Sequence, residues 1–287
     1  MKLGLLGSGL MSRQIAVLFA EFGCEIVVWN RVLRPGAPAA MRAEAEQWRK
    51  DPALLLPRIA YSDALADLAG CELIVESIVE DPAVKKTVLG ELSRVVPGAI
   101  IACNTSSLNI EDLSTAVQGA ERFLGLHFLS PLQRVRFLEI CPCSRTSPQT
   151  LATLRALLQR YGFPFREVPD VPGYLVNHLL MAMLSAAMHL VQDRGVSPQL
   201  IDDALKLAKV TVSGPLQVAD YLGLDTCLRV MESIQRQTGD ARFAPTDMLR
   251  RMVAEGRLGV SSGQGFYNHA VPDAKAARPG NKPADGT

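Results

Sequence analysis

The stretch Lys2–Ala16, KLGLLGSGLMSRQIA, decides the fold that the sequence predicts. A short apolar run leads into a glycine-rich turn at Gly7–Ser12, and a helical pattern begins at Arg13. A strand, a glycine-rich turn and a helix in this order are typical of the dinucleotide-binding unit of an open α/β sheet. The first glycine permits a tight turn, the second lets backbone N–H groups approach a pyrophosphate, and the third position, here Ser12, needs only a small side chain.

The glycine spacing alone is a weak signal, because a strand-to-helix turn without any ligand can share it. The second strand ends about twenty residues after the turn, where a dinucleotide-binding unit requires it to end. We therefore predict that this turn binds a dinucleotide cofactor through Gly7, Ser8, Gly9, Leu10 and Met11.

The second strand lies in the stretch Glu25–Arg31, EIVVWNR, which ends in an amide and a guanidinium. The end of this strand faces the adenosine ribose, where an Asp or Glu would accept from the 2′-hydroxyl and repel a 2′-phosphate. Asn30 removes that repulsion and Arg31 can pair with the phosphate, which favours NADP(H). In the alternative, Asn30 bonds the ribose hydroxyls of NAD and Arg31 is a solvated surface charge.

Short apolar runs alternate with helical patterns from Lys2 to about Val168. This alternation predicts an α/β fold, a Rossmann-type doubly wound parallel sheet with helices on both faces, over residues 1–169. The predicted strands are KLGLLG, EIVVW, RIAYS, ELIVES, AIIAC, RFLGLHF, VRFLEI and FPFREV.

The segment Pro169–Gly173, PDVPG, marks the end of this domain, because two prolines and a glycine cannot continue a helix or a strand. Tyr174–Arg194 follows as a long, apolar-rich helix with Gly195 as its cap. Residues 170–269 are predicted to form a smaller all-helical domain. Residues 270–287 are rich in Pro, Gly, Ala, Asp and Lys and predict a disordered tail. Further helices are expected at Ile201–Ala208, Leu216–Leu222, Leu228–Gln237 and Thr246–Glu255.

The composition is that of a globular protein with almost no net charge. The chain has 287 residues, of which 48% are hydrophobic, and its 30 basic and 29 acidic side chains leave a formal charge of +1. No net field therefore draws it to nucleic acid or to an anionic membrane. It opens on KLGLLG without a charged n-region, and no run of about 18 apolar residues follows, so we expect a cytoplasmic protein. The cysteines lie mostly in apolar runs, as buried thiols do, and no metal site is expected at Cys141-Pro142-Cys143.

Four further stretches begin as buried strands and end in polar residues. The carboxyl ends of strands in an open α/β sheet carry the ligand-binding groups, so these stretches predict a cleft. Asn104 and Ser106, in the second of them, are assigned to the cofactor site. The stretches are Val75–Asp81 (VESIVED), Asn104–Leu108 (NTSSL), Gly125–Pro131 (GLHFLSP) and Phe137–Ile140 (FLEI).

These stretches, together with Asp170–Asn177, Gly214–Asp220 and Gly256–Tyr267, resemble the 3-hydroxyacyl-CoA dehydrogenase family. The resemblance follows the family's order and covers nearly the whole chain to Tyr267. It implies a Rossmann domain followed by a helical, dimer-forming domain. It also implies an oxidoreductase that interconverts 3-hydroxyacyl and 3-oxoacyl thioesters.

The resemblance assigns roles to individual residues. Glu80 and Lys85 match positions that line the family's cofactor pocket. Two positions depart from the family's pattern, which usually has an acid where Asn30 stands and Asn-Pro where this chain has Ser130-Pro131. The family's catalytic quartet corresponds to Ser106, His127, Glu139 and Asn177.

The chemistry of hydride transfer explains why these residue types are suitable. A base must take the 3-hydroxyl proton as the hydride leaves, and the ordinary pKa of histidine lies near working pH. A carboxylate behind His127, supplied by Glu139, would fix the tautomer and stabilise the imidazolium. Ser106 could bond the reacting oxygen and Asn177 the enolate or thioester carbonyl. In the alternative, Ser106 caps a helix and Asn177 bonds locally.

The segment between the second and third strands bears on whether coenzyme A or acyl carrier protein carries the acyl group. In the resembled family this segment is a long helical hairpin over coenzyme A, whereas Val32–Arg58 has room for one helix, Ala39–Lys50. Arg42, Arg49 and Lys50 could still meet a phosphate, or could form a solvated helix face. The shortening favours a second hypothesis, in which a short polar hydroxyacyl group is carried by acyl carrier protein in polyketide precursor synthesis. A third is a non-catalytic dinucleotide-binding structural or sensor protein, which the presence of both His127 and Glu139 disfavours.

Overall fold

The computed structural model describes residues 1–269, so the predicted disordered tail at 270–287 lies outside the described residues. The chain divides into two compact units, Met1–Leu179 and a second that begins at Leu180. The first unit therefore continues ten residues past the expected boundary at residue 169. It does so because the segment after β8 is tied to the sheet domain: the Asp170 carboxylate accepts hydrogen bonds from the backbone N–H groups of Ile110 and Glu111, at 3.1 and 2.8 Å.

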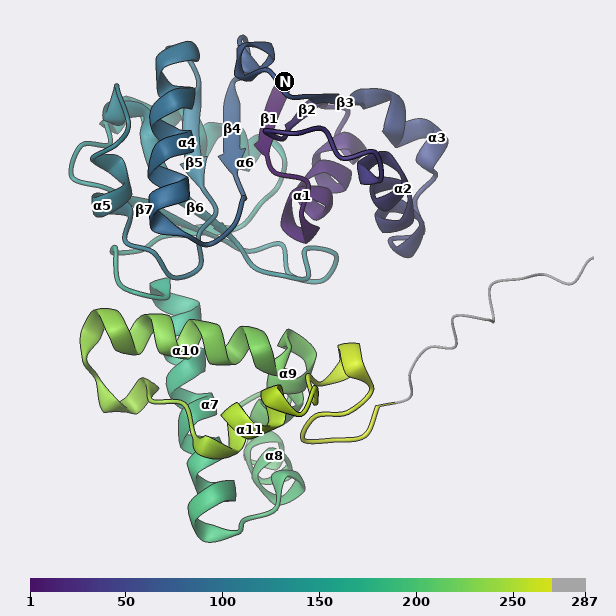
Figure 1. Ribbon diagram of the computed structural model, residues 1–287, viewed down its shortest axis with the longest axis vertical. Coiled ribbons are helices and arrows are strands. Elements are labelled where there is room, and N and C mark those ends of the chain that lie inside the picture. The colour runs from purple at the N-terminus through teal and green to yellow at the C-terminus, as the bar shows by residue number, and fades with distance from the viewer. Residues whose placement is uncertain (270–287) are drawn as a thin grey trace, which may run out of the picture. The chain divides into compact units, whose positions relative to one another are not determined.

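The first unit is built on one eight-stranded sheet with the order β3-β2-β1-β4-β5-β6-β7-β8 (Figure 1). Every predicted strand is present. The sheet is parallel, as predicted, except at one pairing, where β6 and β7 run antiparallel. Residues 129–137 alone join them, too few for the helical crossover that a parallel pair needs. The strands are β1 Lys2–Leu6, β2 Glu25–Trp29, β3 Ile59–Ser62, β4 Leu73–Glu76, β5 Ile100–Cys103, β6 Phe123–Phe128, β7 Leu138–Pro142 and β8 Phe165–Glu167.

Both faces of the sheet are buried, as a doubly wound fold requires. Alternate residues of β1 go to opposite faces: Leu3 and Leu5 join one apolar cluster, and Leu6 joins another. The first cluster is closed by α1 (Leu10–Glu21), α2 (Ala37–Gln47) and α6 (Pro148–Arg160). The second is closed by α4 (Pro82–Val95) and α5 (Ile110–Ser114), which lie over the other face (Figure 1).

The connection from β2 to β3 is compact, as expected, but its helix is displaced. The predicted helix Ala39–Lys50 is α2, Ala37–Gln47, which starts earlier because Pro38 suits a first helical turn. It ends earlier because Arg49 takes a positive φ of 57°. A short second helix, α3 (Pro52–Leu55), follows, and its cap is the Asp51 side chain.

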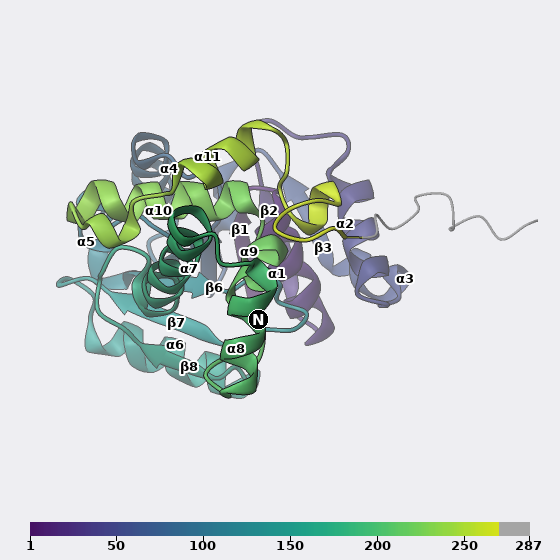
Figure 2. The same cartoon turned by 90° about the horizontal axis from the view of Figure 1, so that it is seen from below.

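The second unit is all-helical and gathers around the later part of α7, Tyr174–Arg194 (Figures 1 and 2). Met181, Leu184 and Met188 of α7 pack in one core with residues from every following helix. The four predicted later helices are α8 (Pro198–Leu207), α9 (Pro215–Leu222), α10 (Leu224–Thr238) and α11 (Asp247–Ala254). Short 3₁₀ turns complete the described chain at Leu56–Arg58, Leu65–Leu68, Ala120–Arg122, Ala241–Phe243 and Val260–Ser262.

Two buried carboxylates explain the glycine-containing stretches of this unit. Asp202 accepts hydrogen bonds from the backbone N–H groups of Leu216 and Gln217 at 2.9 Å each, and from the Tyr267 hydroxyl at 2.8 Å. A Cβ at Gly214 would overlap the Asp202 side chain. Asp220 likewise holds the backbone N–H of Tyr267. The stretches Gly214–Asp220 and Gly256–Tyr267 therefore serve the architecture of the helical unit.

Among the described residues, α7 is the one helix long and apolar enough by length and composition to cross a membrane, a property that core helices of soluble proteins share.

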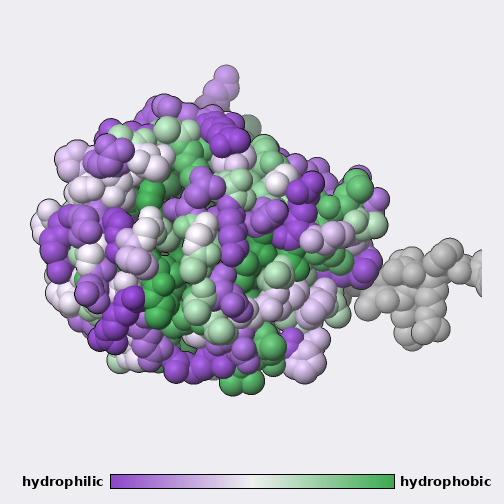
Figure 3. Space-filling model, turned by 90° about the horizontal axis from the view of Figure 1, so that it is seen from above, coloured by the Kyte–Doolittle hydropathy of each residue, from purple (hydrophilic) through white to green (hydrophobic). Residues whose placement is uncertain are grey.

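The face at the amino ends of β2 and β3 carries a shallow pocket between Lys2, Glu25 and Arg58. Figure 3 views the molecule from above and shows apolar residues interspersed among hydrophilic ones. The pocket between Lys2, Glu25 and Arg58 lies at the amino ends of the strands, whereas the polar residues predicted to form the site lie at their carboxyl ends.

Candidate active site

The glycine turn has the geometry that a pyrophosphate requires. Gly7 has a φ of +99°, and a Cβ there would lie 2.7 Å from the Ser77 carbonyl oxygen. A Cβ at Gly9 would meet nothing within 4 Å, so this part of the turn is open. Gly9 precedes α1 without any side-chain cap, which leaves the first N–H groups of the helix available to an anion. Leu10 and Met11 form the first turn of that helix.

The end of β2 faces the glycine turn. Ser8 Oγ donates to Asn30 Oδ1 at 3.1 Å, while Asn30 Nδ2 is buried and has no hydrogen-bond partner among the described residues. An orphaned buried donor beside the turn fits a ligand that carries an acceptor there. Arg31 does not point at an open site, because its guanidinium pairs with Glu91 at 2.8 Å on the surface.

The predicted acid–base residues are brought together by strand pairing. His127 on β6 and Glu139 on β7 are direct cross-strand partners, and His127 Nδ1 lies 2.8 Å from Glu139 Oε2. The other ring nitrogen, Nε2, lies 3.2 Å from Ser106 Oγ, so the ring connects the two side chains. Both His127 and Glu139 are almost fully buried, at 2% and 0% exposure.

Glu139 is held from its other side by the start of α7. Its Oε1 accepts from the backbone N–H groups of Leu175 and Val176, at 3.0 and 2.9 Å. Both carboxylate oxygens therefore have a partner, and with Glu139 as a carboxylate His127 Nδ1 donates its proton to Oε2. The Tyr174 ring lies against the imidazole, with ring centroids 5.0 Å apart. Asn177 stands one helical turn further along α7 and is half-buried.

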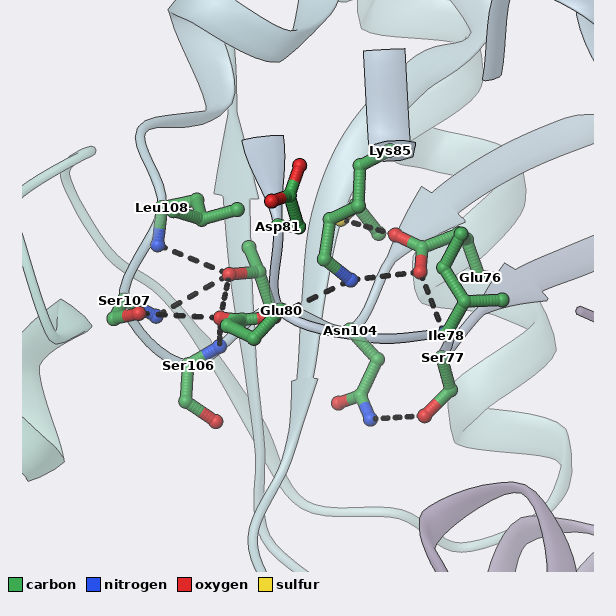
Figure 4. A network of polar contacts seen from close by, with 12 residues as sticks. Glu76, Ser77, Ile78, Glu80, Asp81, Lys85, Asn104, Ser106, Ser107 and Leu108 are labelled. Carbon is green, nitrogen blue, oxygen red and sulfur yellow. Dashed lines mark hydrogen bonds and ion pairs between the residues drawn. The ribbon is translucent and has the colours of Figure 1, made fainter. Parts of the chain in front are cut away.

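A second polar network, not predicted as such from the sequence, lies at the ends of β4 and β5 (Figure 4). Lys85 is 1% exposed, and its ammonium lies 2.7 Å from Glu76 and 3.3 Å from Glu80. Burial acts to lower the pKa of Lys85, but the two carboxylates outweigh it and raise the pKa. Burial raises the pKa of Cys103 well above its ordinary value, so its thiol donates to Glu76 Oε2, at 2.8 Å.

Asn104 bridges three strand ends. Its Nδ2 donates to Ser77 Oγ at 3.2 Å, and its Oδ1 accepts from the backbone N–H of Phe128 at 2.9 Å. Asn104 therefore connects the ends of β4, β5 and β6. Glu76 and Tyr174 are site residues that were not predicted from the sequence. The signal for Glu76 was a carboxylate at the end of the apolar run LIVE.

Other histidines and basic residues of the described chain make local contacts. His189 Nδ1 bonds the Ser185 carbonyl at 2.9 Å and His178 Nδ1 the Pro172 carbonyl at 3.0 Å. Of the basic residues on the β2–β3 connection, Lys50 pairs with Glu21, whereas Arg42 and Arg49 are exposed. The Ser130–Pro131 peptide bond is cis.

An open glycine turn at the first strand, with a carboxylate-paired histidine at the same edge of a Rossmann sheet, is typical of a dinucleotide-binding oxidoreductase. The family models described as "3-hydroxyacyl-CoA dehydrogenase, NAD binding domain" and "3-hydroxyacyl-CoA dehydrogenase, C-terminal domain" match residues 2–163 and 173–269. The chain belongs to the 3-hydroxyacyl-CoA dehydrogenase family.

Individual relatives agree with this assignment. The chain is 34% identical over 278 residues to a probable 3-hydroxybutyryl-CoA dehydrogenase of Deinococcus radiodurans, covering 94% of this chain and 100% of that protein. It is 32% identical over 279 residues to 3-hydroxybutyryl-CoA dehydrogenase of Bradyrhizobium diazoefficiens, covering 93% and 95%. The crystal structure of (S)-3-hydroxybutyryl-CoA dehydrogenase PaaH1 from Ralstonia eutropha superposes with a TM-score of 0.83 at 31% identity, covering 94% and 99%.

Proposed function

We propose that the protein interconverts a 3-hydroxyacyl thioester and its 3-oxoacyl form, with His127 and Glu139 as the acid–base pair. The observation that carries the proposal is the 2.8 Å contact of His127 Nδ1 with Glu139, which leaves Nε2 as a proton acceptor beside Ser106. When bound, the nicotinamide would supply the acceptor or donor of the hydride.

The chain's own residues would move and hold the proton. His127 Nε2 takes the proton of the 3-hydroxyl in oxidation and returns it in reduction, while Glu139 stabilises the imidazolium. Ser106 Oγ, at 3.2 Å from Nε2, is close enough to bond the same substrate oxygen. Asn177 is proposed to donate its amide to the enolate or the thioester carbonyl.

The cofactor would be held by the glycine turn and by the ends of β2, β4 and β5. Glu80 and Asn104 are proposed to line this pocket together with the turn. The preference for NADP(H) rests on Asn30 at the end of β2, whose free amide donor suits a phosphate or a hydroxyl. To bind the 2′-phosphate, Arg31 must give up its ion pair with Glu91. That pair is exposed and contributes only about 0–1 kcal/mol. NAD remains the second candidate, with Asn30 on the ribose hydroxyls.

The experiment that tests the proposed function is a direct assay. The purified protein is given 3-hydroxybutyryl-CoA with NADP or NAD, and cofactor reduction is followed by absorbance. Turnover is expected with the wild type. Cofactor binding without any turnover on short 3-hydroxyacyl thioesters would instead support the non-catalytic dinucleotide-binding role.

The carrier of the acyl group is proposed to be acyl carrier protein, with coenzyme A as the other candidate. The short β2–β3 connection supports this proposal, because it offers few basic residues for the phosphates of coenzyme A. Between Val32 and Arg58, Lys50 pairs with Glu21, whereas Arg34, Arg42 and Arg49 have no ion pair among the described residues. A short polar hydroxyacyl group is the proposed substrate, since Ser130 stands where the family usually has Asn.

A homodimer is proposed as the assembly. The helical unit exposes apolar side chains that a monomer would leave in water, including Leu207 at 84%, Val210 at 66% and Val212 at 100%. Exposed apolar groups of this kind mark protein interfaces. Light scattering after size exclusion would show twice the 31.1 kDa chain mass if the proposal holds.

A further inference from the structure

Lys85 is a buried cation in the midst of the polar network at the ends of β4 and β5 (Figure 4). It stands in the first turns of α4, and 1% of its side chain is exposed. Its ammonium faces Glu76 at 2.7 Å and Glu80 at 3.3 Å. Glu76 is itself fixed, because its Oε1 also accepts from the backbone N–H of Ile78 at 2.8 Å and its Oε2 from Cys103. The cation is therefore anchored at the sheet and reaches toward Glu80.

Glu80 uses its other oxygen to hold the loop after β5. Its Oε1 accepts from the hydroxyl of Thr105, from the backbone N–H of Ser106 at 3.0 Å and from Ser107 Oγ at 3.2 Å. One carboxylate oxygen thus organises three successive residues, while Oε2 faces Lys85. Burial acts to raise the pKa of Glu80, but Lys85 and the bonds from Thr105 and Ser106 outweigh it and lower the pKa.

The loop that Glu80 holds carries the hydroxyl that contacts the proposed base. Ser106 donates its backbone N–H to Glu80 and places its Oγ 3.2 Å from His127 Nε2. A continuous path of contacts therefore leads from Lys85 through Glu80 and Ser106 to His127. Thr105 strengthens the loop, since its Oγ1 also accepts from the backbone N–H of Leu108 at 3.0 Å.

We propose that Lys85 is a positioning residue for the reaction, which acts through Glu80 on the loop Asn104–Leu108 and so sets Ser106 against His127. This inference rests on the proposed function of that site. Without the ammonium, Glu80 loses its counter-ion and is free to turn toward water, since 39% of its side chain is already exposed. The loop would then lose the acceptor that holds three of its donors. A shift of about 1 Å in a catalytic group can cost ~10²-fold in rate.

Positioning by Lys85 and direct binding of the cofactor by Lys85 would change different kinetic constants. A residue that only contacts the cofactor would raise the cofactor Kd and leave kcat at saturating cofactor unchanged, whereas positioning lowers kcat at saturating cofactor. Because Glu80 is proposed to line the cofactor pocket, the Kd can change as well. We expect kcat to fall by at least about tenfold in Lys85→Met. The matched control is Lys86→Met on the same helix, whose ammonium pairs with Asp112 at the surface, and its kcat should be unchanged.

A double-variant cycle tests the route of the effect. If Lys85 acts through Ser106, then Lys85→Met should cost less than about twofold in a Ser106→Ala background, because the contact it supports is already gone. Losses that multiply in the double variant would overturn the proposal. So would a Lys85→Met variant whose kcat at saturating cofactor equals that of the wild type.

A measurement without substrate separates this proposal from the proposed function. The chain has 4 histidines, so the imidazole ¹⁵N signals of His127 can be assigned by difference with His127→Ala. The Nε2 signal should move in Lys85→Met in the same direction as in Ser106→Ala, and should stay in place in Lys86→Met. An unmoved signal in Lys85→Met overturns the positioning role, whereas a wild type that turns over no thioester refutes only the reaction.

Lys85→Met leaves carboxylates without their cation and can unfold the protein, so Glu80→Gln is the second variant. Glu80 is partly exposed, and glutamine keeps its shape and one acceptor oxygen while removing the charge that Lys85 orients. The same outcomes are expected, namely a lower kcat, a shifted His127 signal and little further loss with Ser106→Ala. Wild-type values for all three would overturn the proposal.

Discussion

At the scale of single residues, the proposed chemistry of this protein depends on His127 and Glu139. Both carboxylate oxygens of Glu139 have hydrogen-bond partners. Oε2 contacts His127, and Oε1 accepts from two backbone N–H groups of α7. In its neutral form, the ring therefore carries its proton on Nδ1 and leaves Nε2 unprotonated. This arrangement is what a general base requires, and it depends on both residues.

The first prediction concerns this pair. His127→Ala should lower kcat by at least ~10²-fold with cofactor affinity little changed, because the proton acceptor is lost. Glu139→Gln should also lower kcat severely. Its amide oxygen must serve Leu175 and Val176, so its NH₂ faces Nδ1 and the proton moves to Nε2. Steady-state kinetics and cofactor titration measure both effects.

A matched histidine provides the control. His189→Ala removes a ring that bonds the Ser185 carbonyl in the helical unit, and its kcat should equal that of the wild type. Near-normal turnover in His127→Ala or in Glu139→Gln would remove that residue from the mechanism.

The second prediction concerns cofactor choice at the end of β2. The wild type should bind NADPH more tightly than NADH. Arg31→Ala should weaken NADPH by ~10–100-fold and barely change NADH, since a charge-assisted contact is worth ~1.5–3 kcal/mol. Asn30→Asp should shift preference toward NADH by repelling the 2′-phosphate. Glu91→Gln frees Arg31 from its surface partner and should leave NADPH binding equal or tighter. Calorimetric titration decides, and a wild type that binds both cofactors equally would refute the assignment.

At the scale of elements, three helix N-termini in this protein are paired with carboxylates that come from distant parts of the chain. The start of α5 is held by Asp170, the start of α9 by Asp202, and the start of α7 by Glu139. The free N–H groups at a helix start favour an anion there. In two cases the result is structural, and in the third the anion is the carboxylate that orients the proposed base.

The third prediction tests such a pairing in the helical unit. Asp202→Asn should lower the free energy of unfolding by about 1.5–3 kcal/mol, because a fully buried acceptor of three hydrogen bonds becomes partly a donor. Tyr267→Phe, which removes one of those bonds, should cost only about 0.5–1.5 kcal/mol. Chemical denaturation followed by circular dichroism measures both.

The neighbouring residue supplies the comparison. Asp203 lies on the same helix, pairs with Lys206 at 2.9 Å and is partly exposed, so Asp203→Asn should change stability by no more than about 0.5 kcal/mol. If Asp202→Asn and Asp203→Asn lower the free energy of unfolding equally, the buried hydrogen bonds of Asp202 do not account for its predicted effect on stability.

At the scale of the whole molecule, the near balance of charge and the compact β2–β3 connection bear on the carrier. Coenzyme A presents a 3′-phosphate and a pyrophosphate, which need basic partners. A carrier protein would bring affinity through a protein–protein contact, and such transient interfaces are small and salt-sensitive.

The fourth prediction compares carriers directly. One acyl group is offered on coenzyme A, on pantetheine and on acyl carrier protein, and kcat/KM is measured at low and high salt. The protein-linked substrate should be the best of the three, with an advantage that shrinks as salt rises, and coenzyme A should exceed pantetheine only slightly. If the coenzyme A ester is the best substrate instead, coenzyme A is the carrier. Arg42, Arg49 and Lys50 are then the residues to substitute.

The sequence by itself determined the local elements of this protein. All eight strands, the long α7 and the glycine turn follow from the spacing of apolar residues and from turn residues, which act over a few positions along the chain. The family resemblance also identified His127 and Glu139. Because a strand's end is a local feature, the polar residues at the carboxyl edge were predictable too.

Only the tertiary structure decided how distant residues meet. The antiparallel return of β7 pairs His127 directly with Glu139, and the start of α7 fixes Glu139 from behind. Burial of Lys85 between Glu76 and Glu80 likewise depends on how α4 packs against β4 and β5. These contacts join residues that lie far apart in sequence or on different elements, so no local pattern encodes them. They arise from strand order and from the requirement that every buried charge has a partner.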